Sequence, residues 1–329
     1  MNKIMKVTKN NNGFKSLLFF WRYKLKIRLG YVGGSMNLED CSPSKTVTVS
    51  TLDNLSDYSG KIKKLKKTAA ENLDNTLRIL RYNKVNLIEV YRLTSKLFPL
   101  ATYPGIEYTN YVDELSNKLL EIGNFVKENK IRVSMHPDHF VLLNSISKKV
   151  YEDSLKELAY QDDILNRMGL DSKYKFVLHV GGIYTSKEES IKRFYIGFKE
   201  LPESIKNRVI LENDDKSYNA SDVINICQKT NIPFVFDVHH HNCNSCKESI
   251  EDILRFAFKS WENEYFPTKF HISSPKSVRQ IRNHADFIDE NEFMLFIEQA
   301  KKFNKDFDIM VEAKKRDEAV KKLLEVVKL

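Results

Sequence analysis

Residues 233–241 read Pro-Phe-Val-Phe-Asp-Val-His-His-His, a pattern that combines a fold signal with a chemical one. The apolar, β-favouring residues Phe234 to Phe236 predict a short buried strand. The acid Asp237 ends that strand, and the histidines 239–241 follow it. A buried strand that ends in a carboxylate and imidazoles predicts a functional site at its carboxyl end.

Seven further runs of this kind occur along the chain, and helical periodicity separates most of them. They are Ile27–Val32, Leu87–Leu93, Ile131–Met135, Lys175–Val180, Arg208–Leu211, Thr268–Ile272 and Asp306–Val311. Eight strands that alternate with helices favour parallel pairing, and eight is the number that closes a barrel. We therefore expect an α/β protein with a single (β/α)8 TIM barrel, with a doubly wound open sheet as the alternative.

The net charge is unevenly distributed. The chain has 329 residues and a formal net charge of +9, but residues 1–30 hold eight Lys or Arg and no acid, which leaves +1 for the rest. We expect residues 1–25 to be a poorly ordered basic extension and residues 26–329 to be one domain.

The apolar run Leu17–Trp21 is too short to cross a membrane. Four cysteines are too few for a disulfide framework, so we expect a reduced protein of the cytoplasm, with an organellar or nuclear location only for a eukaryotic source.

The glycine pairs Gly33-Gly34 and Gly181-Gly182 match neither the dinucleotide nor the P-loop spacing. No nucleotide cofactor is therefore expected.

All eight histidines lie after residue 135, most of them at expected strand ends or just beyond them, and His139 and His284 in the loops after the third and seventh strands. They are His136, His139, His179, His239, His240, His241, His271 and His284. The acids Glu212, Asp237 and Glu312 occupy the ends of three apolar runs. In a TIM barrel the carboxyl ends of all strands face one mouth, so these side chains would converge. A buried carboxylate needs a cation, and the surrounding imidazoles favour metal ions over salt bridges to Lys or Arg.

Mixed imidazole and carboxylate ligands suit Zn, Mn or Fe, and their number indicates more than one ion. Two or three ions a few ångströms apart are typical of phosphodiester cleavage. Lys269 lies two residues before His271, so strand alternation places both on one face. A lysine there would be neutral, or carboxylated and itself a ligand; the alternative is that Lys269 faces a helix.

Seven blocks in order resemble the UV damage endonuclease family. They are Arg28-Leu-Gly-Tyr-Val, Tyr91-Arg-Leu-Thr-Ser-Lys-Leu-Phe-Pro-Leu-Ala-Thr, Met135-His-Pro-Asp-His-Phe, Leu178-His-Val-Gly-Gly, Leu211-Glu-Asn-Asp-Asp, Val235-Phe-Asp-Val-His-His-His and Lys269-Phe-His-Ile-Ser-Ser. The resemblance implies a TIM barrel related to endonuclease IV, with two or three Mn²⁺ ions. It also implies nicking of DNA immediately 5′ of cyclobutane pyrimidine dimers, 6-4 photoproducts and abasic sites.

The resemblance assigns roles to individual residues. The implied metal ligands are His136, His179, Glu212, Asp237, His240, His271, His284, Glu312 and a carboxylated Lys269. Among these, Glu212, Lys269 and His179 are the implied catalytic residues. His139 and Phe140 fall where the family inserts a probing pair opposite the flipped lesion, although His139 stands where Gln is usual. Tyr31 and Tyr103 are further expected DNA contacts, Tyr103 standing where relatives have His.

The implied partner is damaged double-stranded DNA, bound by a monomer at the nucleoid and not at a membrane. Three alternatives stay open. The first is an endonuclease IV-like enzyme that cuts abasic sites and ignores photolesions. The second is a xylose-isomerase-like sugar isomerase on the same barrel, and the third is a DNA-binding protein without activity.

Overall fold

The computed structural model describes residues 2–9, 15–22, 25–55 and 57–327. Eight parallel strands form one sheet in the order β5-β4-β3-β12-β9-β8-β7-β6. Their bounds are β3 Ile27–Val32, β4 Val90–Arg92, β5 Arg132–Ser134, β6 Phe176–Leu178, β7 Val209–Glu212, β8 Phe234–Asp237, β9 Thr268–Ile272 and β12 Phe307–Val311. A parallel bridge between Met135 and Phe176 joins the two edges, so the sheet closes into a barrel. The expected TIM barrel is confirmed, and each of the eight expected runs overlaps one of these strands; β7 extends one residue beyond its run, to Glu212.

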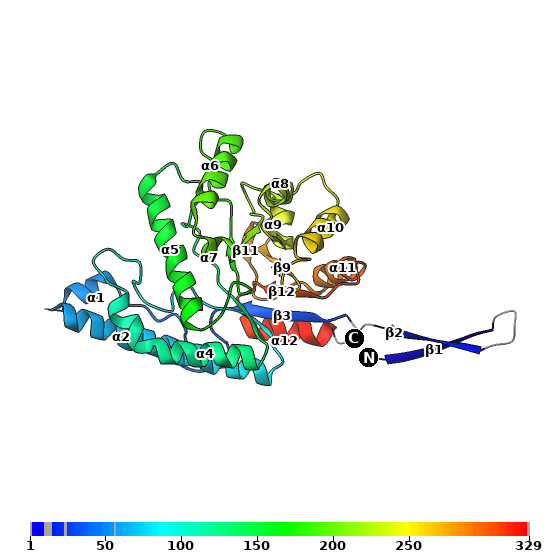
Figure 1. Ribbon diagram of the computed structural model, residues 1–329, viewed down its shortest axis with the longest axis horizontal. Coiled ribbons are helices and arrows are strands. Elements are labelled where there is room, and N and C mark those ends of the chain that lie inside the picture. Colours follow the sequence, from blue (N-terminus) through cyan, green and yellow to red (C-terminus); the bar gives the residue numbers. More distant parts are fainter. Residues whose placement is uncertain (1, 10–14, 23–24, 56, 328–329) are drawn as a thin grey trace.

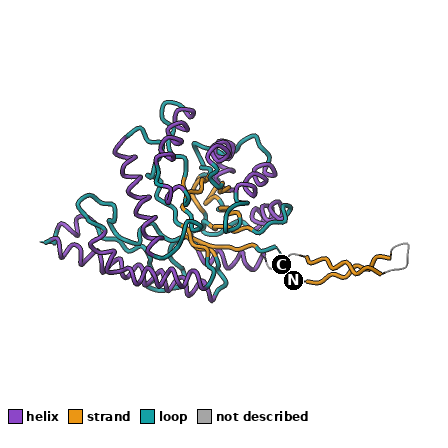
Figure 2. Tube along the Cα trace, in the orientation of Figure 1, coloured by secondary structure: helices purple, strands orange, loops and turns teal. Residues whose placement is uncertain are grey.

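Helices surround the strands, as the tube in Figure 2 shows. Their bounds are α1 Val49–Asp53, α2 Tyr58–Val85, α3 Thr109–Val112, α4 Ser116–Glu128, α5 Lys148–Arg167, α6 Lys187–Glu200, α7 Glu203–Lys206, α8 Ala220–Thr230, α9 Val238–Cys243, α10 Ile250–Ser260, α11 Glu290–Lys301 and α12 Arg316–Val327, with a 3-10 turn at Asp113–Leu115. The longest, α2, begins where the side chain of Asp57 accepts a hydrogen bond from the Gly60 amide. Its apolar stripe, which includes Leu65, Leu73 and Leu80, is buried.

The barrel interior is layered, as is usual for this fold. At the amino-terminal end, Asp308 accepts hydrogen bonds from Arg28 and Arg132, and the Arg132 guanidinium lies over the Trp261 ring at 4.7 Å. Val177, Ile210 and Val235 form a small apolar layer with Trp261. The carboxyl-terminal layer consists of polar side chains and forms the site described below.

Two hairpins stand apart from the barrel sheet. β1 Asn2–Lys9 and β2 Lys15–Arg22 pair with each other only, and Figure 1 shows them extending away from the barrel. The division at residues 25 and 26 stays a prediction. A second hairpin, β10 Pro275–Ser277 and β11 Gln280–His284, follows β9. His284 therefore lies on a strand, whereas the sequence predicted a loop. The strand could not be predicted because it is exposed and polar and lacks an apolar pattern.

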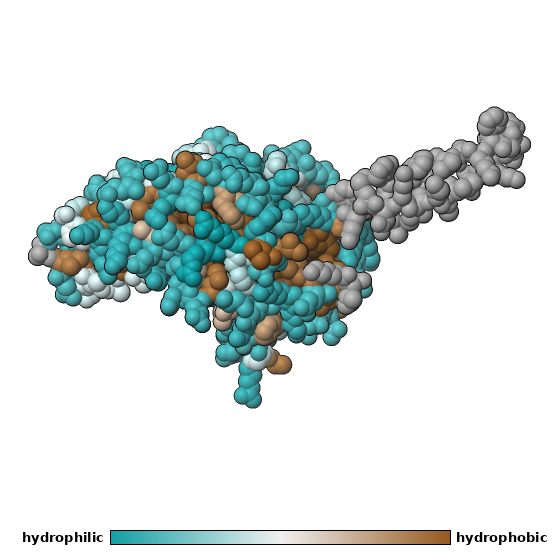
Figure 3. All heavy atoms as spheres, turned by 90° about the horizontal axis from the view of Figure 1, so that it is seen from below, coloured by the Kyte–Doolittle hydropathy of each residue, from teal (hydrophilic) through white to brown (hydrophobic). Residues whose placement is uncertain are grey.

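One face of the outer surface is mostly polar. In the face shown in Figure 3, hydrophilic side chains predominate and apolar ones gather in separate patches. Among the described residues, no helix is both long and apolar enough to span a membrane.

Gly123 of α4 packs directly against Met168, the C-cap residue of α5. A Cβ atom there would lie 1.7 Å from the carbonyl oxygen of Met168, a backbone atom that cannot rotate away. We expect Gly123→Ala to lower the free energy of unfolding by about 2–3 kcal/mol, measured by denaturant titration. The matched control is Gly60→Ala in the exposed first turn of α2, where the nearest atom is the Asp57 side-chain oxygen at 3.3 Å. Equal stability of the two variants would contradict this packing.

Candidate metal centre

Glu212, the last residue of β7, lies at the centre of the mouth and is 1% exposed. Four imidazoles approach its carboxylate from other parts of the barrel. His271 Nδ1 lies 3.1 Å from Oε2 and His240 Nδ1 lies 3.2 Å from Oε1. His136 Nε2 and His179 Nε2 lie 3.5 Å and 3.9 Å from Oε2. The mouth thus brings together side chains from β7, β9, helix α9 and the loops after β5 and β6.

Two groups of side chains have the geometry of metal ligands. The first contains His136, His179 and Glu212, and the second contains Glu212, Asp237 and His271. Within each group the ligand atoms lie within 4.8 Å of one another, and Glu212 belongs to both. Two ligands about 2.1 Å from one ion are separated by roughly 3–3.5 Å, close to several distances around Glu212. These residues can hold divalent metal ions.

The buried polar atoms of these side chains support the same conclusion. Among the described residues, those without a hydrogen-bond partner include Glu212 Oε2, Asp237 Oδ2, His179 Nδ1 and both ring nitrogens of His271. Leaving such atoms buried and unpaired is costly, about 1–3 kcal/mol each. Divalent cations among them would offset that cost, so the residues present fit a metal centre.

The protonation of the centre also suits metal binding. Burial alone would raise the pKa of Glu212, but His271 and His179 outweigh it and hold the pKa well below its usual range. Burial lowers the pKa of His179. An ionised carboxylate and a neutral imidazole are the forms that bind metals.

Asp237 and His240 form a coupled pair. Burial raises the pKa of Asp237, and the carboxylates of Asp237 and Glu212 outweigh burial to raise the pKa of His240. In the metal-free protein the pair thus retains a proton near Glu212. A bound cation would replace that proton as the neutralising charge.

Only one residue of the histidine triplet faces Glu212. Asp237 caps helix α9 by accepting a hydrogen bond from the His240 amide at 2.7 Å, and this turn directs the His240 ring to Glu212. His241 packs against Phe236, and His239 lies beside His284 with ring centroids 5.6 Å apart.

Glu312 occupies the other side of the mouth. Its carboxylate lies 3.3 Å from His271 Nδ1 and 3.8 Å from His284 Nδ1. Arg92 Nη1 donates a hydrogen bond to it at 2.6 Å. Burial alone would raise the pKa of Glu312, but Arg92 and His271 outweigh burial and lower it. The sequence reasoning missed Arg92, although it ends β4 and the strand-end argument applies to it equally.

Asn213 is a second residue that the sequence reasoning missed. Its side-chain amide donates to the carbonyl of Asp237 at 3.0 Å and accepts from the Asp237 amide at 2.9 Å. These two bonds join β7 to β8 immediately beside Glu212. Asn213 therefore positions the acids and is not itself within either ligand group.

Lys269 faces the barrel interior, one layer below His271. Its side chain is fully buried, and Nζ donates a hydrogen bond to Ser134 Oγ at 2.6 Å. Burial, together with Arg132 and Arg92, holds the pKa of Lys269 well below its usual range, which favours the neutral amine. The alternative in which Lys269 faces a helix is therefore excluded, but the amine lies outside the two ligand groups.

His139 and Phe140 lie on the loop after β5 and both are exposed. Phe140 is 54% exposed, and the two rings meet edge to face with centroids 5.9 Å apart. The residues 136–139 line two adjoining hollows, one of about 370 Å³ with Arg92 and one of about 430 Å³ with His179 and His240. Tyr103, on the loop after β4, is 43% exposed.

Tyr31 is not at the mouth. It is fully buried, its hydroxyl donates to Asn83 of α2 at 2.8 Å, and its ring packs on Tyr91. On β3 the side chain of Tyr31 points outward to α2, because inward and outward positions alternate along a strand. The expected DNA contact at Tyr31 is therefore corrected to a structural role.

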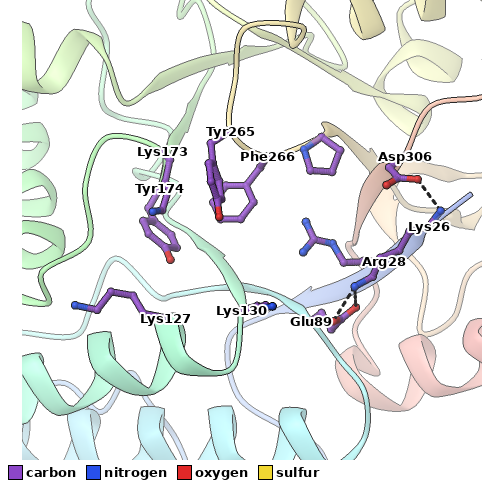
Figure 4. A pocket seen from close by; sticks show the side chains of 11 residues that line it. Lys26, Arg28, Glu89, Lys127, Lys130, Lys173, Tyr174, Tyr265, Phe266 and Asp306 are labelled. Carbon is purple, nitrogen blue, oxygen red and sulfur yellow. Dashed lines mark hydrogen bonds and ion pairs between the residues drawn. The ribbon is translucent and has the colours of Figure 1, made fainter.

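A hollow of about 350 Å³ opens at the other end of the barrel. Figure 4 shows the aromatic rings of Tyr174, Tyr265 and Phe266 along it. Its strand residues, such as Arg28, come from the amino-terminal part of the barrel. This hollow is thus separate from the metal centre.

The fold and site define a TIM barrel with a candidate divalent-metal centre at the carboxyl ends of its strands. Residues 27–329 match the family described as UV-endonuclease UvdE. The chain belongs to this family and is accordingly an endonuclease of DNA repair that acts on UV damage.

Individual relatives agree with that assignment. The chain is 41% identical over 299 residues to a UV DNA damage endonuclease of Bacillus cereus strain B4264, covering 91% of this chain and 94% of that protein. A relative with the same name in Bacillus mycoides is 41% identical over 298 residues, covering 91% and 93%. The crystal structure of SacUVDE superposes with a TM-score of 0.83 at 34% identity, covering 92% of this chain and 98% of that one.

More distant structures share the fold alone. Endonuclease IV from Thermus thermophilus matches with a TM-score of 0.52 at 12% identity, covering 77% of this chain and 93% of that one. A 3-keto-D-glucoside 4-epimerase from E. coli matches with a TM-score of 0.56 at 13% identity, covering 92% and 99%. This likeness to a sugar enzyme does not extend beyond the fold, so it does not support the sugar-isomerase alternative.

Proposed function

We propose that the chain cuts damaged duplex DNA immediately 5′ of cyclobutane pyrimidine dimers, 6-4 photoproducts and abasic sites. The cut is a metal-assisted hydrolysis that follows extrusion of the lesion from the helix. The observation that carries the proposal is the position of Glu212, which belongs to both groups of candidate ligands at the barrel mouth. An arrangement with two neighbouring ions suits in-line displacement at phosphorus.

The resident ions proposed are two or three Mn²⁺. His136 and His179 with Glu212 would hold one, and Asp237 and His271 with Glu212 a second. The remaining candidate ligands, His240, His284 and Glu312, surround these groups, and His284 with Glu312 would complete a third site. When bound, such ions supply acidity to water and neutralise charge that develops on the phosphate.

The protein side chains hold this centre in place. Asn213 fixes the backbone of Asp237 through two hydrogen bonds, and Asp237 fixes helix α9 through the His240 amide. Arg92 pairs with Glu312 and brings a permanent positive charge to the hollow that adjoins His136. Arg92 can therefore bind a phosphate oxygen of the substrate.

Lys269 is proposed to be carboxylated in the active enzyme. Burial lowers the pKa of its amine and so favours the neutral, nucleophilic form, whose lone pair can attack carbon dioxide. The nitrogen–carbon bond forms as one carbon–oxygen π bond opens and its electron pair passes to oxygen. The nitrogen releases one proton to water, and a carbamate results. The anionic carbamate would serve as a further metal ligand beside His271.

Photolesions and abasic sites stack poorly, so their extrusion from the duplex costs little. His139 and Phe140 are proposed to fill the space that the extruded nucleotides leave. The hollows beside these residues would receive the extruded nucleotides, and Tyr103 lies on a neighbouring loop as a further contact. The enzyme is proposed to act as a monomer on nucleoid DNA in the cytoplasm.

Phe140→Ala should reduce kcat/KM on a dimer-containing duplex about 10-fold, since stacking on an aromatic side chain contributes about 1–3 kcal/mol per base. Metal content should stay unchanged, because Phe140 is in neither ligand group. The matched control is Tyr265→Ala, which removes an exposed aromatic ring, 74% exposed, at the opposite end of the barrel. Equal activity of the Phe140→Ala and Tyr265→Ala variants would show that Phe140 takes no part in lesion recognition.

Parallel nicking assays test the proposed substrate range. One duplex carries a single cyclobutane dimer, another carries an abasic site, and an undamaged duplex is the control, each with Mn²⁺. We expect cleavage of both damaged duplexes and none of the control. Cleavage of the abasic duplex alone would leave the endonuclease IV-like alternative.

A further inference from the structure

The β10–β11 hairpin, Pro275–His284, is an exposed arm with a fixed base. Residues 275–283 are all exposed, and the two-residue turn Val278-Arg279 forms its tip. The base is held because the Ser274 carbonyl accepts from the Ala285 amide at 2.9 Å, and Ser274 Oγ accepts from the Asp289 amide at 2.9 Å. The arm is therefore a defined projection of the barrel.

The arm is basic and carries apolar side chains in water. Its cations are Lys276, Arg279 and Arg282, and it contains no acid. Arg282 pairs with Asp215 at 3.4 Å, but within the described part of the chain Lys276 and Arg279 have no carboxylate partner. Val278 is 93% exposed. Unpaired cations around an exposed apolar tip indicate a surface that meets an anionic partner.

The arm rises from the rim of the metal centre. His284, at its base, lies 3.8 Å from the Glu312 carboxylate. Ile281 is tied to helix α9, since its carbonyl accepts a hydrogen bond from Cys243 Sγ at 3.6 Å. β10 runs only from Pro275 to Ser277 before the turn, so the tip at Val278 lies about 10 Å from the base, and Lys276 lies nearer to the base. An arm of that length spans about three base pairs of duplex DNA, which rises about 3.4 Å per base pair.

We propose that this arm grips the duplex beside the damaged site, with Lys276 and Arg279 on backbone phosphates within about three base pairs of the cut. Val278 then packs against sugars at the edge of the major groove, which is wide enough to admit a two-stranded β-ribbon. This inference rests on the proposed function. The arm supplies local positive charge to a barrel whose net charge, outside the first 30 residues, is only +1.

The first test compares two double variants of the full-length, metal-loaded enzyme on a dimer-containing duplex. Lys276→Ala with Arg279→Ala should raise KM about 10-fold and leave kcat unchanged. The slope of log(kcat/KM) against log[salt] should become shallower by about 2, one for each lost phosphate contact. The control, Lys301→Ala with Lys302→Ala, removes the same charge from exposed residues at the distal end of α11 and should behave as wild type.

A second test locates the contacts. Single methylphosphonates, which lack the phosphate charge, are placed at each position of the duplex. Wild type should lose kcat/KM at phosphates within about three base pairs of the cut that the arm contacts, and the arm variant should be insensitive at those same phosphates.

The outcomes separate the two proposals. If wild type does not nick damaged DNA, the proposed function fails. If it nicks and the arm variant matches the control in KM, salt slope and methylphosphonate pattern, the arm proposal is overturned. A loss of bound metal in the arm variant would also overturn it, since the arm would then serve to retain metal. A wild-type dimer that the arm variant disrupts would overturn it as well, since the arm would then serve self-association.

Discussion

Glu212→Gln should reduce nicking of damaged DNA by about 10³–10⁴-fold and release bound metal. Glu212 belongs to both candidate ligand groups, so the substitution removes one anionic ligand from each. Metal ions contribute several kcal/mol of transition-state stabilisation, and each 1.4 kcal/mol corresponds to a factor of ten in rate. Nicking of a dimer-containing duplex under single-turnover conditions measures the rate, and elemental analysis measures the metal.

The matched control is Glu298→Gln, the same change at an exposed position of helix α11. It should retain wild-type activity and metal content. Because glutamine has nearly the shape of glutamate, the Glu212→Gln variant should stay folded, which circular dichroism checks. Full activity of the Glu212→Gln variant would contradict the proposal that Glu212 lies in a catalytic metal centre.

Lys269→Met should reduce nicking by about 10–100-fold, the usual effect of losing a group that supports a metal centre. Methionine fills the interior space left by the lysine stem but offers neither the amine nor a carbamate. If Lys269 is carboxylated, bicarbonate should stimulate wild type that was prepared free of carbon dioxide, and it should leave the variant unchanged.

Lys175→Met is the control for losing a buried lysine. Lys175 is 7% exposed, donates to the Asn207 carbonyl and pairs with Glu264, at the amino-terminal end of β6. Its replacement should lower stability but leave kcat of the folded protein unchanged. Equal kcat in both variants would show that Lys269 has a structural role only.

The barrel could be predicted from the sequence because its strands are buried on both faces. Runs such as Val209–Glu212 and Phe234–Asp237 are apolar until the mouth, and the first polar residue marks the strand end. The same rule identified Glu212 and Asp237, which the structure places in one candidate ligand group.

Other features could not be predicted because they depend on orientation or on contacts between distant segments. Tyr31 looked like a residue of the mouth, yet strand alternation directs it to Asn83 of α2. The hairpin Pro275–His284 has no buried face, so no apolar pattern indicates its strands. Arg92 acquires its role only through Glu312, 220 positions away.

The most direct test of the central claim is the position and chemistry of the cut. A duplex with one cyclobutane dimer, labelled at either end of the damaged strand, is incubated with the Mn²⁺-loaded enzyme and the products are mapped. The account predicts one nick immediately 5′ of the dimer, leaving a 3′-hydroxyl and a 5′-phosphate. A nick elsewhere, a 3′-phosphate, or equal cleavage of the undamaged duplex would contradict it.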